Sequence, residues 1–148
     1  MTTIQCCEYI SSSPEETFLL GKRLGTSLPQ DSVIALYGDL AAGKTTFVKG
    51  VTHGASGCHP DEVTSPTFVF LNIYEGGKTV YHFDLYRLTT PQDFLDMGFD
   101  EYFFSQGLCC VEWAENIENL LPSSTVSVSI NHIEENKRRI TIQPWSEA

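Results

Sequence analysis

The sequence has no run of about 18 apolar residues, the length that a membrane-spanning helix needs, among its 148 residues. Its N-terminus has no basic segment followed by an apolar stretch, so we expect no secretory signal and no membrane partner. The five cysteines are odd in number and contain no CxxC pair, which argues against a disulfide framework. His53, Cys58 and His59 lack the paired spacing of a structural zinc site. These absences predict a cytoplasmic protein with free thiols.

Basic residues are also scarce, with nine Lys plus Arg against 19 Asp plus Glu and a formal net charge of -10. A nucleic-acid backbone would be repelled by this field, so direct binding of tRNA or DNA is disfavoured. The acidic residues that crowd the half after Asp84 can form a solvated face or a surface for a basic partner.

Two motifs that would narrow the class of nucleotide enzyme are missing. The Asn-Lys-x-Asp tetrapeptide by which GTPases read guanine is absent, so adenine is the expected base. Small-molecule kinases carry several arginines in a lid, whereas the arginines here are Arg23, Arg87, Arg138 and Arg139. Without an arginine finger in a mobile lid, we expect slow hydrolysis by the protein alone.

The first half of the chain predicts alternating helices and strands. Ser13, followed by Pro14 and Glu16, is typical of a helix start with a capping box, and we expect Gly25 and Pro29 to end that helix. The apolar run 33–37 predicts a buried strand. Residues 44–53 suit a second helix, which Gly54 and Gly57 should break.

The second half adds two hairpins and a helical segment. Turns at residues 75–78 and 134–137 predict antiparallel strand pairs, residues 91–107 predict one or two helices, and residues 108–113 predict another buried strand. We therefore expect one α/β domain over residues 1–148, with a P-loop NTPase fold and a mixed parallel and antiparallel sheet flanked by helices.

The segment GDLAAGKT, from Gly38 to Thr45, matches the pattern GxxxxGK[ST] of a phosphate-binding loop. In such a loop the backbone N–H groups wrap the α- and β-phosphates, Lys44 neutralises the β- and γ-oxygens, and the Thr45 hydroxyl ligates magnesium. The strand before the loop and the helix after it are where this mechanism requires them. ATP and Mg²⁺ are therefore the expected cofactors.

Hydrolysis also needs a carboxylate that helps to hold magnesium and a group that orients the attacking water. Asp84 and Glu112 each end a hydrophobic strand, and either can be such an acid or an ordinary helix cap. In VTSPTF, the hydroxyls of Thr64, Ser65 and Thr67 can sense the γ-phosphate. The same segment can equally be a polar turn before a strand.

Four segments in order, GDLAAGKTTFVKG, VTSPTF, HFDLYRL and VEWAENI, resemble the TsaE family, also called YjeE. The resemblance implies a bacterial P-loop ATPase required for the threonylcarbamoyladenosine modification next to the anticodon of tRNA. It also implies two partners, TsaB and TsaD, of which TsaD transfers the threonylcarbamoyl group and a partner holds the tRNA. Hydrolysis would then drive a conformational step of the TsaB–TsaD pair.

The same resemblance assigns residues in this chain. The phosphate loop becomes Gly38, Asp39, Leu40, Ala41, Ala42, Gly43, Lys44, Thr45 and Thr46. Asp84 and Glu112 become catalytic or metal-binding acids, with Glu112 favoured for magnesium, and Trp113 lies near the site. Ser13 and Thr17 are candidates near the adenine. Ala41 departs from the family, where glycine is common, and alanine would reshape the loop if that position needed a positive φ.

Two other functions stay open at this point. A small-molecule kinase would pass the γ-phosphate to a hydroxyl of an acceptor metabolite. A nucleotide-gated binding module would use ATP to order the VTSPTF segment, and hydrolysis would be incidental.

Overall fold

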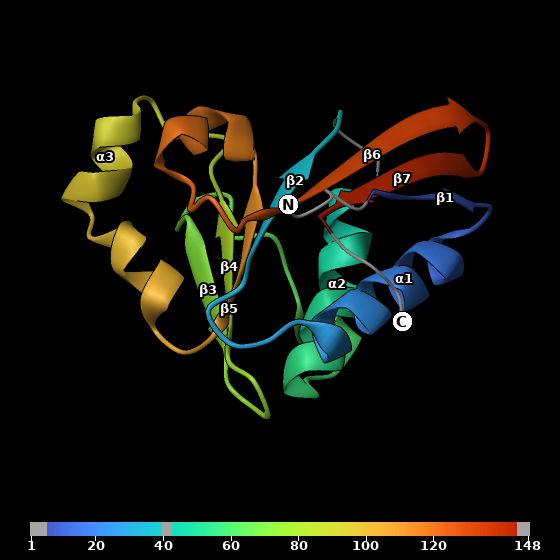
Figure 1. The fold of residues 1–148 in the computed structure, drawn as a ribbon, viewed down its shortest axis with the longest axis horizontal. Coiled ribbons are helices and arrows are strands. Elements are labelled where there is room, and N and C mark those ends of the chain that lie inside the picture. Colours follow the sequence, from blue (N-terminus) through green and yellow to red (C-terminus); the bar gives the residue numbers. More distant parts are fainter. Residues whose placement is uncertain (1–5, 40–42, 145–148) are drawn as a thin grey trace, which may run out of the picture.

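One mixed sheet organises the chain (Figure 1) in the computed structural model, which describes residues 6–39 and 43–144. Its strand order is β1-β7-β6-β2-β5-β4-β3. The strands are β1 (Cys7–Ser11), β2 (Val33–Tyr37), β3 (Leu71–Tyr74), β4 (Val80–Asp84), β5 (Leu108–Glu112), β6 (Val126–Glu134) and β7 (Lys137–Gln143). The four central strands β6, β2, β5 and β4 run parallel. Strands β7 and β3 pair antiparallel with the two outer strands of this group, and β1 pairs antiparallel with β7. The predicted hairpins are β3–β4 and β6–β7, whereas edge strand β1 was not predicted.

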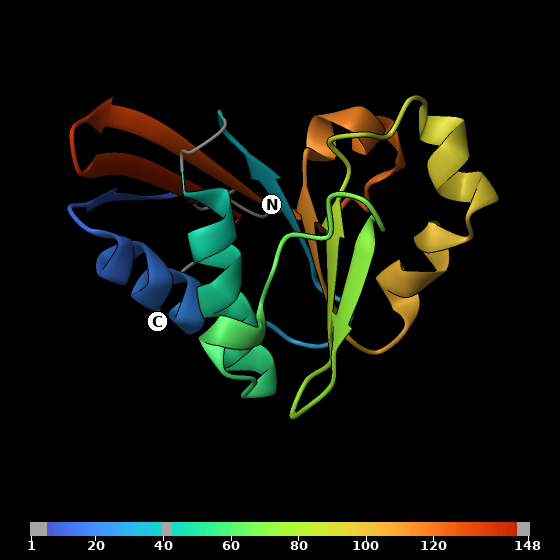
Figure 2. The ribbon, with the colours of Figure 1, turned by 180° about the vertical axis from the view of Figure 1, so that it is seen from behind.

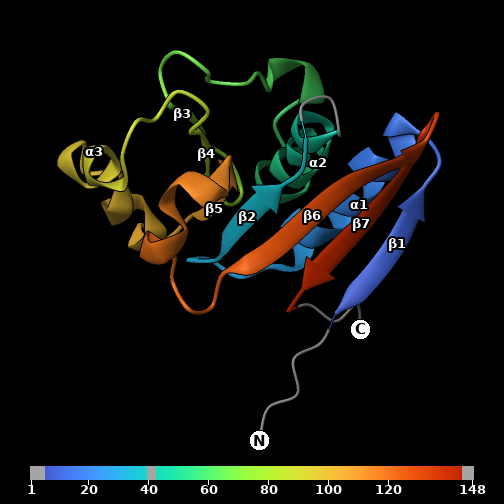
Figure 3. The ribbon, with the colours of Figure 1, turned by 90° about the horizontal axis from the view of Figure 1, so that it is seen from above.

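Helices lie on both faces of the sheet (Figure 3). They are α1 (Pro14–Ser27), α2 (Lys44–Ser56), α3 (Pro91–Asp96) and the short 3₁₀ helices η1 (Pro60–Glu62), η2 (Phe99–Phe104) and η3 (Ala114–Leu120). In the described ranges, none of these helices is both long and apolar enough to span a membrane. The predicted α/β fold, with a mixed sheet flanked by helices, is confirmed.

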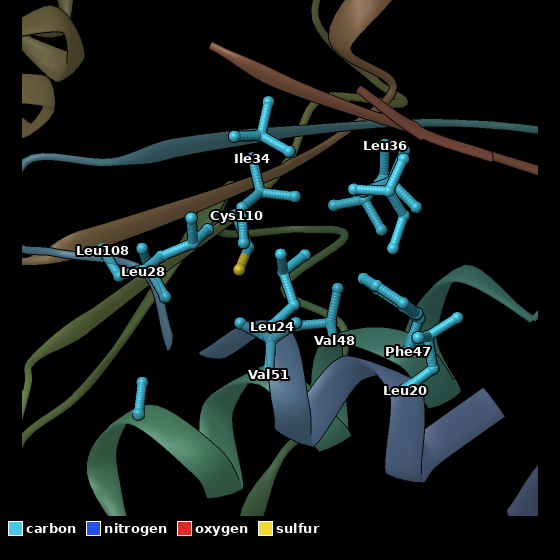
Figure 4. Close-up of a cluster of buried hydrophobic side chains, with 14 of the residues drawn as sticks. Leu20, Leu24, Leu28, Ile34, Leu36, Phe47, Val48, Val51, Leu108 and Cys110 are labelled. Carbon is cyan, nitrogen blue, oxygen red and sulfur yellow. The ribbon is translucent and has the colours of Figure 1, made fainter. Parts of the chain in front are cut away.

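Strand β2 is buried on both faces, which explains why its sequence is an unbroken apolar run. Ile34 and Leu36 face the cluster under α1 and α2, while Val33 and Ala35 face the cluster under α3, η2 and η3. Figure 4 shows side chains of α1 and α2 pointing toward those of β2 and β5 in the first cluster. The strand that leads into the phosphate loop is therefore fixed from both sides.

Helices α1 and α2 pack backbone to backbone through glycines (Figure 2). A Cβ on Gly25 would lie 2.2 Å from the carbonyl oxygen of Val51, and one on Gly54 would lie 2.3 Å from that of Lys22. Both contacts are shorter than a van der Waals contact, so only glycine allows this approach. The predictions that Gly25 and Gly54 end their helices were wrong, because each lies inside its helix as a packing surface.

The ends of α1 are satisfied by side chains. At the start, the Ser13 hydroxyl accepts the N–H of Glu16 at 3.1 Å, and the Glu16 carboxylate accepts the N–H of Ser12 at 2.8 Å. At the end, the Lys78 ammonium from the β3–β4 hairpin donates to the carbonyls of Gly25 and Leu28 at 2.7 and 2.6 Å. This lysine ties the hairpin to the last turn of α1.

Candidate functional site

The candidate site lies where three parallel strands end side by side. Glu112, the last residue of β5, pairs in register with Leu36 of β2 and with Asp84, the last residue of β4. Gly38 follows β2 at the same edge, and Gly43 directly precedes α2. Ligands of α/β proteins bind at this carboxyl edge of the sheet.

The N-terminus of α2 is free to receive an anion. Gly43 is its N-cap with φ 108°, no side chain of the described residues caps the helix, and its first turn has no acidic residue. First-turn N–H groups and the helix dipole therefore point at the cleft, and no carboxylate of the first turn itself offsets their partial positive charge. The predicted loop residues Leu40, Ala41 and Ala42 lie outside the described residues, so the effect of Ala41 stays a prediction. Gly38 has φ 145°, a positive value that glycine adopts without the steric cost that a Cβ would bring.

The Lys44 side chain is buried in the cleft and makes two contacts there. Its ammonium donates to the carbonyl oxygen of Gly38 at 2.7 Å, and it lies 3.9 Å from the centre of the Trp113 ring. Trp113 follows β5 with φ 60°, a left-handed conformation that is uncommon for a bulky residue. This conformation lets the indole turn toward Lys44, and its ring lies 5.0 Å from that of Tyr86.

Thr45 and Glu112 meet across the cleft. The Thr45 hydroxyl donates to Oε1 of Glu112 at 3.3 Å, and the other oxygen, Oε2, lies 2.6 Å from Nε2 of His82. The side chain of Glu112 is only 4% exposed. A buried carboxylate needs such partners, because an unpaired one would lose its hydration without compensation.

Asp84 connects the cleft to the segment 63–68. Its Oδ2 accepts hydrogen bonds from the hydroxyls of Ser65 and, at 3.3 Å, Thr67, and its Oδ1 accepts the backbone N–H of Tyr86 at 3.0 Å. Ser65 and Thr67 thus line the cleft. Thr64 instead bonds through its backbone N–H to the Tyr74 hydroxyl at 3.2 Å and is not among the residues that line the cleft.

These side chains enclose a cleft of about 470 Å³. A second cavity of about 160 Å³ adjoins it and is lined by Ser13 and Thr17. Gly43 and Thr46 line both spaces, so the two lie next to each other. Most of the described sequence candidates line one of these two cavities, and Thr17 is held by a 2.7 Å hydrogen bond between its hydroxyl and that of Ser11. Asp39 is exposed beside the loop.

The side-chain oxygens of this cleft suit a cation that is also bound by water or by phosphate. The described residues contain no group of three or more His, Cys, Asp or Glu side chains able to hold a metal. Cys110, on the same strand as Glu112, is not a thiolate ligand, because burial, with Cys109 and Glu112 adding to it, raises the pKa of its thiol well above the ordinary value. The oxygens of Thr45, Glu112 and Asp84 remain, and magnesium is bound by few carboxylates together with phosphates and water.

The sequence reasoning missed residues that line these two cavities and one buried residue that contacts Glu112. Tyr86 lines the cleft, and Asn136 and Arg138, from the β6–β7 hairpin, line the second cavity. The hairpin is far away in the sequence, and no local pattern indicates where its tip lies. His82 was also missed, although its spacing of two from Asp84 on a strand places both on one face.

A strand, a glycine loop and a helix N-terminus, beside acids that end the neighbouring parallel strands, define the P-loop NTPase fold. The comparisons agree with this class. A crystal structure of Bacillus subtilis YdiB superposes with a TM-score of 0.79 at 33% identity, covering 99% of this chain and 90% of that one.

A family model described as threonylcarbamoyl adenosine biosynthesis protein TsaE matches residues 11–140. The TsaE protein of Treponema pallidum is 41% identical over 133 residues, which are 90% of this chain and 97% of the relative. The Bacillus subtilis TsaE protein is 40% identical over 130 residues, or 87% of this chain and 80% of the relative. The chain belongs to the TsaE family of tRNA threonylcarbamoyladenosine biosynthesis proteins.

Proposed function

We propose that this protein binds ATP with magnesium, hydrolyses it, and thereby drives the catalytic cycle of TsaB and TsaD in threonylcarbamoyladenosine synthesis. The observation that carries the proposal is the Thr45–Glu112 contact beside the buried Lys44. In P-loop NTPases, the loop hydroxyl and the acid that ends a neighbouring strand together serve the magnesium site. Here those two groups already lie within hydrogen-bond distance.

Each residue has a role that its position supports. Lys44 exchanges its contact with the Gly38 carbonyl for phosphate oxygens, which match its charge better. Thr45 and Glu112 would hold a magnesium ion, which would neutralise charge on the β- and γ-phosphates. Asp84, which ends the strand next to that of Glu112, acts as the second acid and orients the attacking water. The N–H groups of the α2 N-terminus receive phosphate oxygens.

The base and ribose would occupy the second cavity, beside Ser13 and Thr17. Both cavities share Gly43 and Thr46, which follow directly from the phosphate loop. A nucleotide with its phosphates at α2 therefore has this neighbouring cavity within its reach. This supports the adenosine side of the proposal.

Hydrolysis does no chemistry on tRNA in this proposal. The net charge of -10 would repel a polyphosphate backbone, so tRNA is contacted only through the TsaB–TsaD pair, in the cytoplasm. The cleft also lacks an arginine among its lining residues within the described chain. We therefore expect slow hydrolysis by the protein alone and faster hydrolysis with the partners.

The test is phosphate release from MgATP by the purified protein, alone and with TsaB and TsaD from the same organism. Lys44→Ala is the control, because it removes the phosphate-binding charge. We expect the pair to accelerate hydrolysis and the variant to abolish it. Complex formation without acceleration would contradict the proposal and favour a nucleotide-gated module.

The kinase alternative predicts a different product. Phosphate would be recovered on an acceptor metabolite, and ADP formation would depend on that acceptor rather than on TsaB and TsaD. Radiolabelled γ-phosphate followed by chromatography separates the two outcomes, because hydrolysis gives only free phosphate.

A further inference from the structure

His82 is a buried polar side chain that the proposed function leaves without a role. It lies in the middle of β4, two residues before Asp84, and its side chain is 0% exposed. Its neighbours on the same sheet face include Val80, which belongs to the apolar cluster under α1 and α2. A histidine at such a position costs stability unless its polar atoms have partners.

Its hydrogen bonding is one-sided. Nε2 lies 2.6 Å from Oε2 of Glu112, whereas Nδ1 is buried and has no hydrogen-bond partner among the residues that the structure describes. A carboxylate only accepts hydrogen bonds, so the proton on Nε2 is the one that joins the pair. In a neutral ring with the proton there, Nδ1 is a bare acceptor. The ring is thus placed to serve Glu112 and no other described group.

Glu112 is consequently held at both ends. One oxygen accepts from Thr45 on α2, and the other accepts from His82 on β4. The terminal torsion of a glutamate is broad and roughly two-fold, so a single contact does not fix its plane. Two contacts on opposite oxygens fix it, and the Oε1 edge then faces the phosphate loop.

We propose that His82 is a positioning residue that orients the Glu112 carboxylate toward Thr45, and so prepares the magnesium side of the cleft. This inference rests on the proposed function for its consequence in catalysis, but the contact itself can be tested separately. Removing such outer partners of a metal site typically lowers metal affinity or activity by about 10–100-fold.

Two substitutions separate positioning from packing. His82→Gln keeps an N–H donor that reaches about as far as Nε2, whereas His82→Leu keeps similar bulk and removes the donor. Val80→Ala is the matched control, because Val80 is equally buried on the same face of β4 and contacts the apolar cluster. It perturbs packing without removing a partner of Glu112.

The first measurement is the affinity for ADP by calorimetry, with and without magnesium, together with kcat and KM for MgATP in the presence of TsaB and TsaD. His82→Leu should reduce the gain in ADP affinity on adding magnesium, and kcat, by about 10–100-fold. Its magnesium-free ADP affinity should stay within about two-fold of wild type, and His82→Gln should recover most of the loss. Equal losses in Val80→Ala, or none in His82→Leu, would overturn the proposal.

The second measurement needs neither nucleotide nor hydrolysis. Nitrogen-15 NMR of histidine-labelled protein should show His82 protonated at Nε2, with a proton resonance that shifts in Glu112→Gln. A proton on Nδ1 with none on Nε2, or a resonance indifferent to Glu112→Gln, would overturn the inference. If the wild-type protein binds no ADP while this signature is present, the proposed function fails and the positioning contact stands.

Discussion

Gly50→Ala should change the free energy of unfolding through two effects of opposite sign, a gain in helix propensity and a loss from overpacking. A Cβ at Gly50 would lie 2.0 Å from the carbonyl oxygen of Phe18 and 2.9 Å from the backbone nitrogen of Lys22, both on α1. To restore an ordinary contact, α1 would have to move away from α2 by about 1.4 Å. Alanine is the better helix former by about 1 kcal/mol, but overpacking costs about 1–3 kcal/mol and more where the backbone must shift.

We expect the packing cost to dominate, because the atoms that meet the new Cβ are backbone and cannot rotate away. The free energy of unfolding should fall by about 1–3 kcal/mol, measured by urea denaturation followed by circular dichroism. Lys22→Ala, at an exposed position of α1, should change it by less than about 0.5 kcal/mol. A Gly50→Ala variant more stable than wild type would refute this reasoning, because propensity alone predicts that result.

Three further predictions concern other parts of the molecule. Lys78→Met should lower the free energy of unfolding by about 1.5–3 kcal/mol, since it leaves α1 carbonyls unsatisfied; an unchanged urea midpoint would contradict this. Asp84→Asn should slow phosphate release by about 10–100-fold while calorimetry shows ADP still bound; unchanged release would exclude a catalytic role. Burial, with a smaller contribution from Asp31, raises the pKa of the Cys109 thiol to about 12. The folded state thus keeps this proton to a higher pH than the unfolded chain does. The stability that the thiol contributes is therefore complete below the pKa of the unfolded state, about 8.5, and is lost as pH rises toward 12. Cys109→Ala should flatten this alkaline loss in urea midpoints, and an unchanged slope would contradict it.

Local patterns were sufficient for most of the sheet and for the centre of the site. The apolar run of β2, the strand-ending acids Asp84 and Glu112, and the glycine loop are all set by short-range sequence. Once parallel strands are expected, their carboxyl ends must meet at one edge. The meeting of Thr45 with Glu112 could thus be anticipated before any coordinates.

The misinterpreted glycines and the missed hairpin residues have one physical cause. Gly25 and Gly54 were interpreted from local propensity, in which glycine breaks a helix, but their role depends on the facing helix. The same holds for Asn136 and Arg138, whose place beside α1 follows from the pairing of β7 with β1. Contacts between segments distant in sequence decide these positions, and a single sequence does not show them.

The two walls of the cleft are built differently, and this has a consequence for how the site can respond to a nucleotide. On one side, glycine contacts fix α1 on α2, so Ser13, Thr17 and the helix N-terminus keep their relative positions. On the other side, Ser65 and Thr67 meet the cleft through hydroxyl bonds to Asp84, and the adjoining Phe68 is 78% exposed. Hydroxyl bonds to a carboxylate exchange far more readily than a packed backbone interface separates. Any change on nucleotide binding should therefore appear as altered hydrogen exchange in residues 63–70, with the α1–α2 interface unchanged.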